Sequence, residues 1–217
     1  NGSSGVTEQS VGADNLQWEK AIKLDLGIEG KLFNEQVDFT VDFFRDTRND
    51  IFQQRTMVPD YIGLAEQPFG NVGSMVSYGA DGNISFTQDI GKDFSFTLRG
   101  NFTYTANMVK NWEEAFQKYS YQERADKPYE YYAGYIALGL FRDEDDVKFS
   151  PDQSGIAGRK VLPGDIKYKD VNGDGVINSD DQVPLSYKAN YPRLMYGFGG
   201  EVRWKKLTLG FLFKGTG

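Results

Sequence analysis

Cysteine and histidine are both absent from this chain of 217 residues. Without cysteine, the chain has no disulfide framework, no thiolate metal site and no cysteine nucleophile. Without histidine, it lacks the commonest general base and the usual zinc ligand. The sequence therefore offers few side chains for an enzyme active site, and we expect no catalytic activity.

Basic residues and long apolar runs are also scarce. The chain has 24 Lys and Arg against 31 Asp and Glu, a net charge of −7, which disfavours a nucleic-acid partner. No run of about 18 uncharged apolar residues exists, so a transmembrane helix is excluded. Residues 1–15 lack the basic and apolar regions of a signal peptide, so we expect no export signal there.

Apolar residues instead recur with a period of two, which is typical of strands with one apolar and one polar face. In the first such stretch the apolar side chains are Ile22, Leu24, Leu26 and Ile28. The pattern predicts six strands at approximately residues 19–30, 36–46, 74–88, 94–105, 192–204 and 207–214. Short turns join these strands into three hairpins.

The connections between the hairpins are much longer than the turns within them. They run approximately over residues 47–73 and 106–191. Outer-membrane barrels show this alternation, with short periplasmic turns at one rim and long extracellular loops at the other. The sequence therefore predicts an all-β fold, a segment of a large antiparallel transmembrane β-barrel. An antiparallel sheet packed on a soluble core would explain the alternation equally well, but not the difference in loop length.

A barrel segment gives its side chains defined environments. Charged residues within the strands should face the lumen, because charge that faces lipid near the midplane costs about 2–4 kcal/mol. These residues are Asp38, Asp42, Arg99, Glu201 and Arg203. Aromatic residues at strand ends would form the two interfacial girdles. They are Phe33, Phe94 and Trp204 beside the short turns, and Phe44 and Tyr104 beside the long loops.

Three stretches also carry a family resemblance. They read LQWEKAIKLDLGIEGKLFNEQVDFTVDFFRDTRNDIF, YYAGYIALGLF and PGDIKYKDVNGDGVINSDDQVPLSYKANYPRLMYGFGGEVRWKKLTLGFLFKGTG. From Asn15 to Gly217 the chain resembles the later part of the barrel of SusC/RagA-type TonB-dependent outer-membrane transporters.

The resemblance implies a barrel of about 22 strands with an N-terminal plug. It also implies import of glycans or peptides, a lipoprotein lid of the SusD type and energy supplied through TonB. The sequence shows no plug, no TonB-contacting segment and no terminal strand, and six strands are fewer than the roughly eight that close a barrel. We therefore expect a fragment of a transporter in the outer membrane of a Gram-negative cell, in contact with lipid. A secreted, soluble, calcium-stabilised β-domain that binds glycan or a protein partner is the alternative.

The segment DVNGDGVINSDD, residues 170–181, has the spacing of a calcium-binding loop. Side-chain oxygens stand at positions 1, 3, 5, 9 and 12, position 7 would offer its backbone carbonyl, and Gly175 would allow the sharp turn. The predicted Ca²⁺ ligands are Asp170, Asn172, Asp174, Val176, Asn178 and Asp181. Because position 12 is Asp rather than the longer Glu, we expect weak affinity, about 10⁻⁴ to 10⁻³ M. A turn rich in Asn, Asp and Gly without an ion is the alternative.

Two further segments of the long connection stand out. The acidic run at residues 142–146 is interpreted as a solvated loop, because adjacent carboxylates alternate in direction and cannot flank one bond. The aromatic cluster at residues 129–141 either packs the loop into a stable body or stacks on sugar rings, whose C–H groups suit flat aromatic faces.

Overall fold

The computed structural model describes residues 16–57, 66–187 and 192–217. The expectation for residues 1–15, and the parts of the predicted loops at 58–65 and 188–191, lie outside the described residues. The chain divides into two compact units. Unit 1 comprises Asn1–Glu114, Arg124–Tyr129 and Ala189–Gly217, and unit 2 comprises Ala115–Glu123 and Glu130–Lys188.

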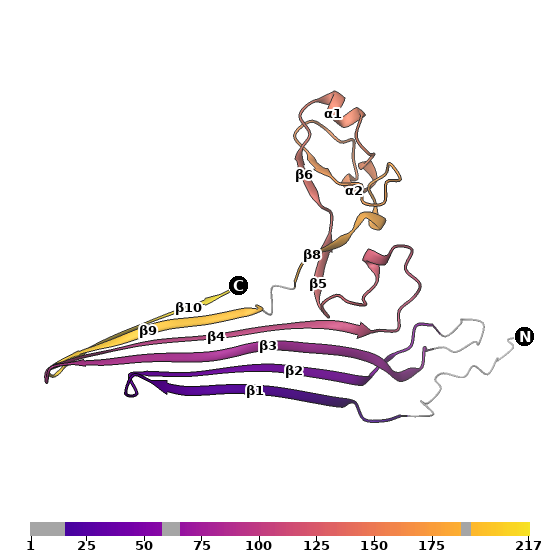
Figure 1. The fold of residues 1–217 in the computed structure, drawn as a ribbon. Helices are drawn as coiled ribbons and strands as arrows, with labels where there is room; N and C mark the ends of the chain where they lie inside the picture. The colour runs from indigo at the N-terminus through magenta and orange to yellow at the C-terminus, as the bar shows by residue number, and fades with distance from the viewer. Residues whose placement is uncertain (1–15, 58–65, 188–191) are drawn as a thin grey trace, which may run out of the picture. The chain divides into compact units, whose positions relative to one another are not determined.

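Unit 1 is a six-stranded antiparallel sheet with the strand order β1-β2-β3-β4-β9-β10 (Figure 1). The strands are β1 (Lys20–Leu32), β2 (Val37–Gln54), β3 (Phe69–Ile90), β4 (Phe94–Asn111), β9 (Leu194–Trp204) and β10 (Leu207–Thr216). The predicted hairpins β1-β2, β3-β4 and β9-β10 all form, and their turns lie together at one end of the sheet (Figure 1). The all-β barrel-segment prediction is confirmed, and the segment does not close on itself.

The strand register separates a largely apolar face from a polar face of the sheet, although Arg45 of β2 lies on the apolar face, opposite Leu24 and Tyr78. Neighbours on adjacent strands share a face, so one row of paired positions contains Phe39, Ile84, Phe198 and Phe213. The next row, on the opposite face, contains Glu29, Thr40, Asn83, Asn101 and Lys214. The apolar side chains remain exposed, with Leu24 at 67% and Leu209 at 71%, rather than sealed in an interior.

The five charged strand residues that were expected to face the lumen follow the same division. Register places them all on the polar face: Asp38, Asp42, Arg99, Glu201 and Arg203. The prediction for Phe44 was wrong. Phe44 lies on the polar face, opposite Asp25 and Gly79, and its ring covers Gly79. It is therefore not part of an interfacial girdle. Phe94 and Trp204 do pair with each other beside the short turns.

Three strands extend well beyond the predicted ends. β2 continues to Gln54, β3 already begins at Phe69 and β4 continues to Asn111. The connections between the hairpins are therefore shorter than the predicted ranges 47–73 and 106–191. The extension passes a register shift between Arg48 and Ile51, where Asp50 has a φ of 57°. Backbone pairing continues there although the alternation of apolar and polar side chains has ended, which is why the sequence pattern missed it.

The buried apolar side chains described in unit 1 lie in or next to this extended region. Val76, Ala106 and Val109 are all buried, and Val109 is fully so. The segment Arg124–Tyr129 folds onto β4, since the Val109 N–H donates to the Lys127 carbonyl (2.8 Å) and the Asp126 N–H donates to the Val109 carbonyl (2.8 Å).

Unit 2 lies within the long connection and has secondary structure of its own. β5 (Tyr131–Gly134) pairs with β8 (Val183–Tyr187), and β6 (Ala137–Leu140) pairs with β7 (Ile166–Tyr168). Short helices α1 (Glu144–Lys148) and α2 (Ser154–Ala157) and the 3-10 turns Ser120–Gln122 and Ser179–Asp181 complete it. Its buried apolar residues are Phe141, Val161 and Ile177. None of the helices in the described residues is long and apolar enough to span a membrane.

Candidate functional site

The predicted calcium loop, residues 170–181, follows β7 closely and ends in the 3-10 turn Ser179–Asp181. Gly173 and Gly175 have φ values of 77° and 84°, a left-handed conformation that glycine adopts without steric cost. The sharp turn expected at Gly175 is therefore present. The six predicted ligands all lie in this one turn-rich segment of unit 2.

Side chains in the first half of the loop bind its backbone. Asp170 accepts the N–H of Gly173 through Oδ1 (2.6 Å) and that of Gly175 through Oδ2 (2.8 Å). The bond from Gly175 is the main cause that lowers the pKa of Asp170 below its usual value, so this carboxylate is ionised at neutral pH. Asn172 accepts the Asp174 N–H (2.9 Å), and Asp174 accepts the Val176 N–H (2.9 Å).

The closing residue, Asp181, holds the two ends of the loop together. Its Oδ1 accepts the Val171 N–H (2.8 Å) and its Oδ2 accepts the Asn178 N–H (2.9 Å), while the residue has 0% exposure. Asn178 in turn accepts the Asp180 N–H (2.7 Å), which completes a capping box. Asp181 thus closes the loop through backbone hydrogen bonds.

A backbone bridge that the sequence did not indicate anchors the middle of the loop. Asp152 and Val176 form an isolated parallel bridge. The Asp152 N–H donates to the Gly175 carbonyl (2.9 Å), and the Ile177 N–H donates to the Asp152 carbonyl (2.7 Å). Ile177 is almost fully buried beneath this bridge.

The carboxylates do not converge on one point. Among the residues that the structure describes, no three or more Asp or Glu side chains are grouped closely enough to hold a metal ion. Each carboxylate still has lone pairs to spare, since an ionised carboxylate offers about four acceptor sites. Metal binding by the six residues therefore stays a prediction.

The acidic run at residues 142–146 is solvated, as expected, since residues 142–145 are exposed, but most of it forms the start of α1 rather than a loop. Asp143 is the N-cap of α1 and accepts the Asp146 N–H (2.8 Å), a common helix-start arrangement. Asp146 is only 10% exposed and accepts Lys167 Nζ (2.9 Å) and Arg142 Nε (3.4 Å). The bond from Lys167 is the main cause that lowers the pKa of Asp146 to about 2.

The aromatic cluster at residues 129–141 divides between packing and exposure. Phe141 is buried in unit 2, whereas Tyr129 packs edge-on against Trp112 in unit 1 (5.5 Å between centroids). Tyr132 remains 48% exposed. Tyr135 lies near Tyr168 of β7, with ring centroids 5.4 Å apart and ring planes inclined by 49°.

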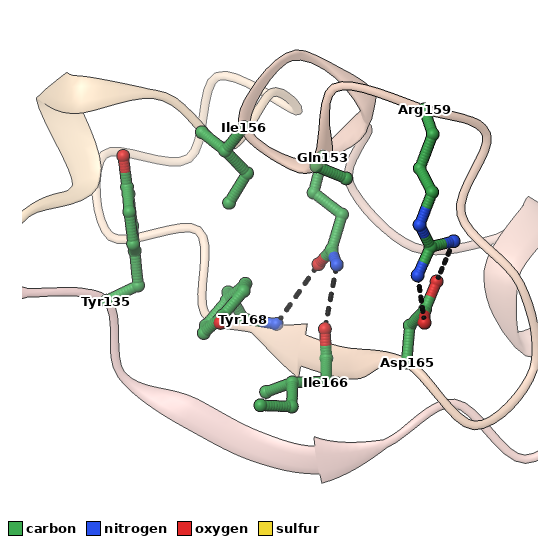
Figure 2. A pocket seen from close by; sticks show the side chains of 8 residues that line it. Tyr135, Gln153, Ile156, Arg159, Asp165, Ile166 and Tyr168 are labelled. Carbon is green, nitrogen blue, oxygen red and sulfur yellow. Dashed lines mark hydrogen bonds and ion pairs between the residues drawn. The ribbon is translucent and has the colours of Figure 1, made fainter.

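These two tyrosines border an open hollow of about 340 Å³ within unit 2 (Figure 2). In Figure 2, Ile156 and Gln153 reach down from the top of the view, with Tyr135 on the left and the paired side chains of Arg159 and Asp165 on the right. Their guanidinium and carboxylate form two parallel bonds of 2.7 and 2.9 Å. Apart from Tyr135, which belongs to the aromatic cluster, no sequence pattern indicated this site.

Comparison with known proteins identifies the family of this chain. The sequence profile of the family described as TonB dependent receptor-like, beta-barrel matches residues 1–215. The chain belongs to this family. TonB-dependent receptors are outer-membrane β-barrel proteins that act as transporters rather than enzymes.

The chain is similar to TonB-dependent receptor P26 of Formosa agariphila, with 26% identity over 98% of the chain and 22% of the relative. It is also similar to the TonB-dependent receptor SusC of Bacteroides thetaiotaomicron, with 23% identity over 94% of the chain and 20% of the relative. The chain thus spans about a fifth of the length of these relatives.

Solved structures show the same fold. The RagAB peptide importer in its open-open state matches 99% of the chain and 22% of that protein with a TM-score of 0.68 at 20% identity. The RagAB peptide transporter matches 92% of the chain with a TM-score of 0.58 at 24% identity. At these identities the likeness establishes the fold alone.

Proposed function

We propose that this chain forms barrel wall and outer loops of a transporter that imports an oligosaccharide or a peptide across the outer membrane of a Gram-negative cell. The observation that carries the proposal is the continuous apolar face of the six-stranded sheet, which stays exposed from β1 to β10. Lipid is the environment in which such a face is stable. The opposite face carries the five charged residues expected to face the lumen: Asp38, Asp42, Arg99, Glu201 and Arg203. Family membership and the names of the relatives support import as the activity.

The same feature weighs against the secreted, soluble alternative. Soluble monomers rarely expose apolar patches larger than a few hundred Å². Here neighbouring apolar side chains contact one another along the face, but the face itself stays exposed and closes into no buried interior among the described residues. The partners of the transporter are a SusD-like surface lipoprotein, outer-membrane lipid and the TonB complex, which would act through a plug outside these 217 residues.

Deletion of the gene in its host tests this proposal. We expect the deleted strain to lose uptake of one class of labelled oligosaccharide or peptide, and a plasmid copy to restore it. Dissipating the proton-motive force in the wild-type strain should stop the same uptake, because TonB couples to that force. Unchanged uptake of both classes, or recovery of the protein in the soluble fraction, would contradict the proposal.

The loop at residues 170–181 binds Ca²⁺ weakly in this proposal and thereby fixes part of unit 2. Support comes from the ligand spacing, from the left-handed glycines and from the ionised carboxylate of Asp170. To coordinate an ion, Asp170, Asp174 and Asp181 would have to use lone pairs that the backbone N–H groups leave free. An ion would also offset the repulsion between these carboxylates.

Isothermal titration of the detergent-solubilised protein with CaCl₂ tests the ion site. We expect a dissociation constant of about 10⁻⁴ to 10⁻³ M, and stabilisation of about 1.4 kcal/mol at 10 mM Ca²⁺ for the weaker limit. Asp174→Asn should weaken binding, whereas Asp145→Asn, in the acidic helix α1, is the matched control that should not. No heat and no stabilisation at millimolar Ca²⁺ would remove the ion from the proposal and leave the transporter intact.

A further inference from the structure

The hollow beside Tyr135 and Tyr168 has the dimensions and the fixed walls of a small-ligand site. Its volume of about 340 Å³ falls at the lower end of the ~300–1,000 Å³ that ligand sites occupy. Hydrogen bonds hold its walls in place: the Tyr135 hydroxyl accepts from Gln182 Nε2 (3.1 Å), and the Tyr168 N–H donates to Gln153 Oε1 (3.2 Å). A ligand would therefore meet two aromatic faces that need little reordering.

Gln153 makes the hollow unsuitable for an extended peptide. A peptide that bound by strand addition would have to pair with the free edge of β7, because the other edge already pairs with β6. The buried Gln153 side chain occupies that free edge, where its Nε2 donates to the Ile166 carbonyl (2.7 Å) and its Oε1 accepts the Tyr168 N–H. The amide of Gln153 thus takes the place of the peptide group that an added strand would supply.

The Arg159–Asp165 pair makes the hollow equally unsuitable for an anion. Each charge neutralises the other through the paired bonds of 2.7 and 2.9 Å, and the same contact lowers the pKa of Asp165. Such a pair still presents N–H donors and carboxylate lone pairs at its rim. Groups that both donate and accept, such as the hydroxyls of a neutral ligand, match this rim.

We propose that this hollow binds a neutral sugar ring, stacked on Tyr168 and Tyr135 with its hydroxyls directed to Arg159 and Asp165. The tyrosine faces suit the C–H face of a pyranose, and the ion pair suits its hydroxyl edge. Sugar binding in the hollow does not depend on the proposed import function. Only the further step, that this sugar is part of the imported substrate, rests on it. That step favours an oligosaccharide over a peptide as the imported substrate.

Binding to the purified full-length protein in detergent tests the proposal. The probes are maltotriose, cellotriose, xylotriose and mannotriose, with trialanine as the peptide, followed by saturation-transfer difference NMR and isothermal titration. We expect at least one trisaccharide to bind at millimolar or lower concentration and trialanine not to bind. Tyr168→Ala should weaken sugar binding about tenfold through loss of one aromatic face.

Two further variants separate loss of the site from loss of the fold. Ala157→Trp would fill the hollow without removing any of the contacts described, and it should also abolish binding. Tyr132→Ala removes an exposed tyrosine of β5 outside the hollow and should bind as the wild type does. The proposal would be overturned if no trisaccharide binds, or if a trisaccharide binds equally well to the wild type and to all of these variants. Binding measured on purified protein is independent of uptake by cells, so this outcome is distinguishable from failure of the import function.

Discussion

Charge placed on the two faces of β3 should have opposite consequences, and Ile84 provides the sharpest test. Ile84 is 53% exposed on the apolar face, and its partners are Phe39 and Gly100. It lies six residues before the end of β3 at Ile90, close to the middle of a membrane-spanning strand of about 9–11 residues. An arginine there would face hydrocarbon near the midplane.

Ile84→Arg should therefore lower the free energy of unfolding by about 2–4 kcal/mol, the cost of a lipid-facing arginine at that depth. The matched control is Asn83→Arg, whose side chain lies on the polar face between Thr40 and Asn101 and should change stability little. Ile90→Arg, on the apolar face at the rim, should cost only about 0–1 kcal/mol. Denaturant unfolding of the full-length protein in phospholipid vesicles measures all three.

Equal losses for Ile84→Arg and Asn83→Arg would refute the assignment of the two faces. A larger loss for Asn83→Arg would invert that assignment. A loss at Ile90 as large as the loss at Ile84 would show that depth in the membrane does not determine the cost, and that the apolar face meets protein rather than lipid.

Two further predictions concern single side chains. The pKa of Asp146 in the folded protein is lowered from 3.8 to about 2, so its contribution to the stability of unit 2 is complete above about pH 4 and is lost as the pH falls through 2. Asp146→Asn should therefore speed hydrogen exchange in α1 relative to wild type at pH 7, and the two proteins should exchange alike below pH 2. Gly79→Ala should destabilise the sheet by about 1–3 kcal/mol in the same vesicle assay, because the added Cβ would meet the Phe44 ring at 2.6 Å and the Tyr104 carbonyl. Gly155→Ala lies in α2, where nothing is within 4 Å of the added Cβ, so it should cause no loss of stability. Equal losses at both glycines would contradict the packing explanation.

The sheet could be predicted because lipid and water impose different side chains on its two faces. Alternation at Ile22, Leu24 and Leu26 located β1, and the register then carried the same face across to β10. The extensions of β2 and β3 could not be found in this way. Residues 47–54 have lost the alternation, yet their backbone pairing with β3 continues through the bulge at Asp50.

Unit 2 was largely beyond the reach of sequence patterns. Its strands β5, β6 and β7 contain only three or four residues each, too few for a period to show. Gln153 is a single polar residue in a loop, and nothing in the sequence indicates that its amide would complete the edge of β7. The left-handed turn at Gly175 was predictable, because position 6 of the calcium-loop motif demands it.

The polar side chains of unit 2 explain how so small an apolar core is held in one conformation. Phe141, Val161 and Ile177 are its only buried apolar residues among those described, so hydrogen bonds to the backbone must fix much of the chain. Asp170 and Asp181 together accept four backbone N–H groups, and these are also the oxygens that an ion would require. The carboxylate oxygens of Asp170 and Asp181 therefore hold the loop in shape without an ion, and the same oxygens would coordinate an ion. Because a carboxylate retains lone pairs after accepting two N–H groups, the loop can keep its hydrogen bonds and still approach a weakly held cation, which accounts for an expected affinity in the millimolar range.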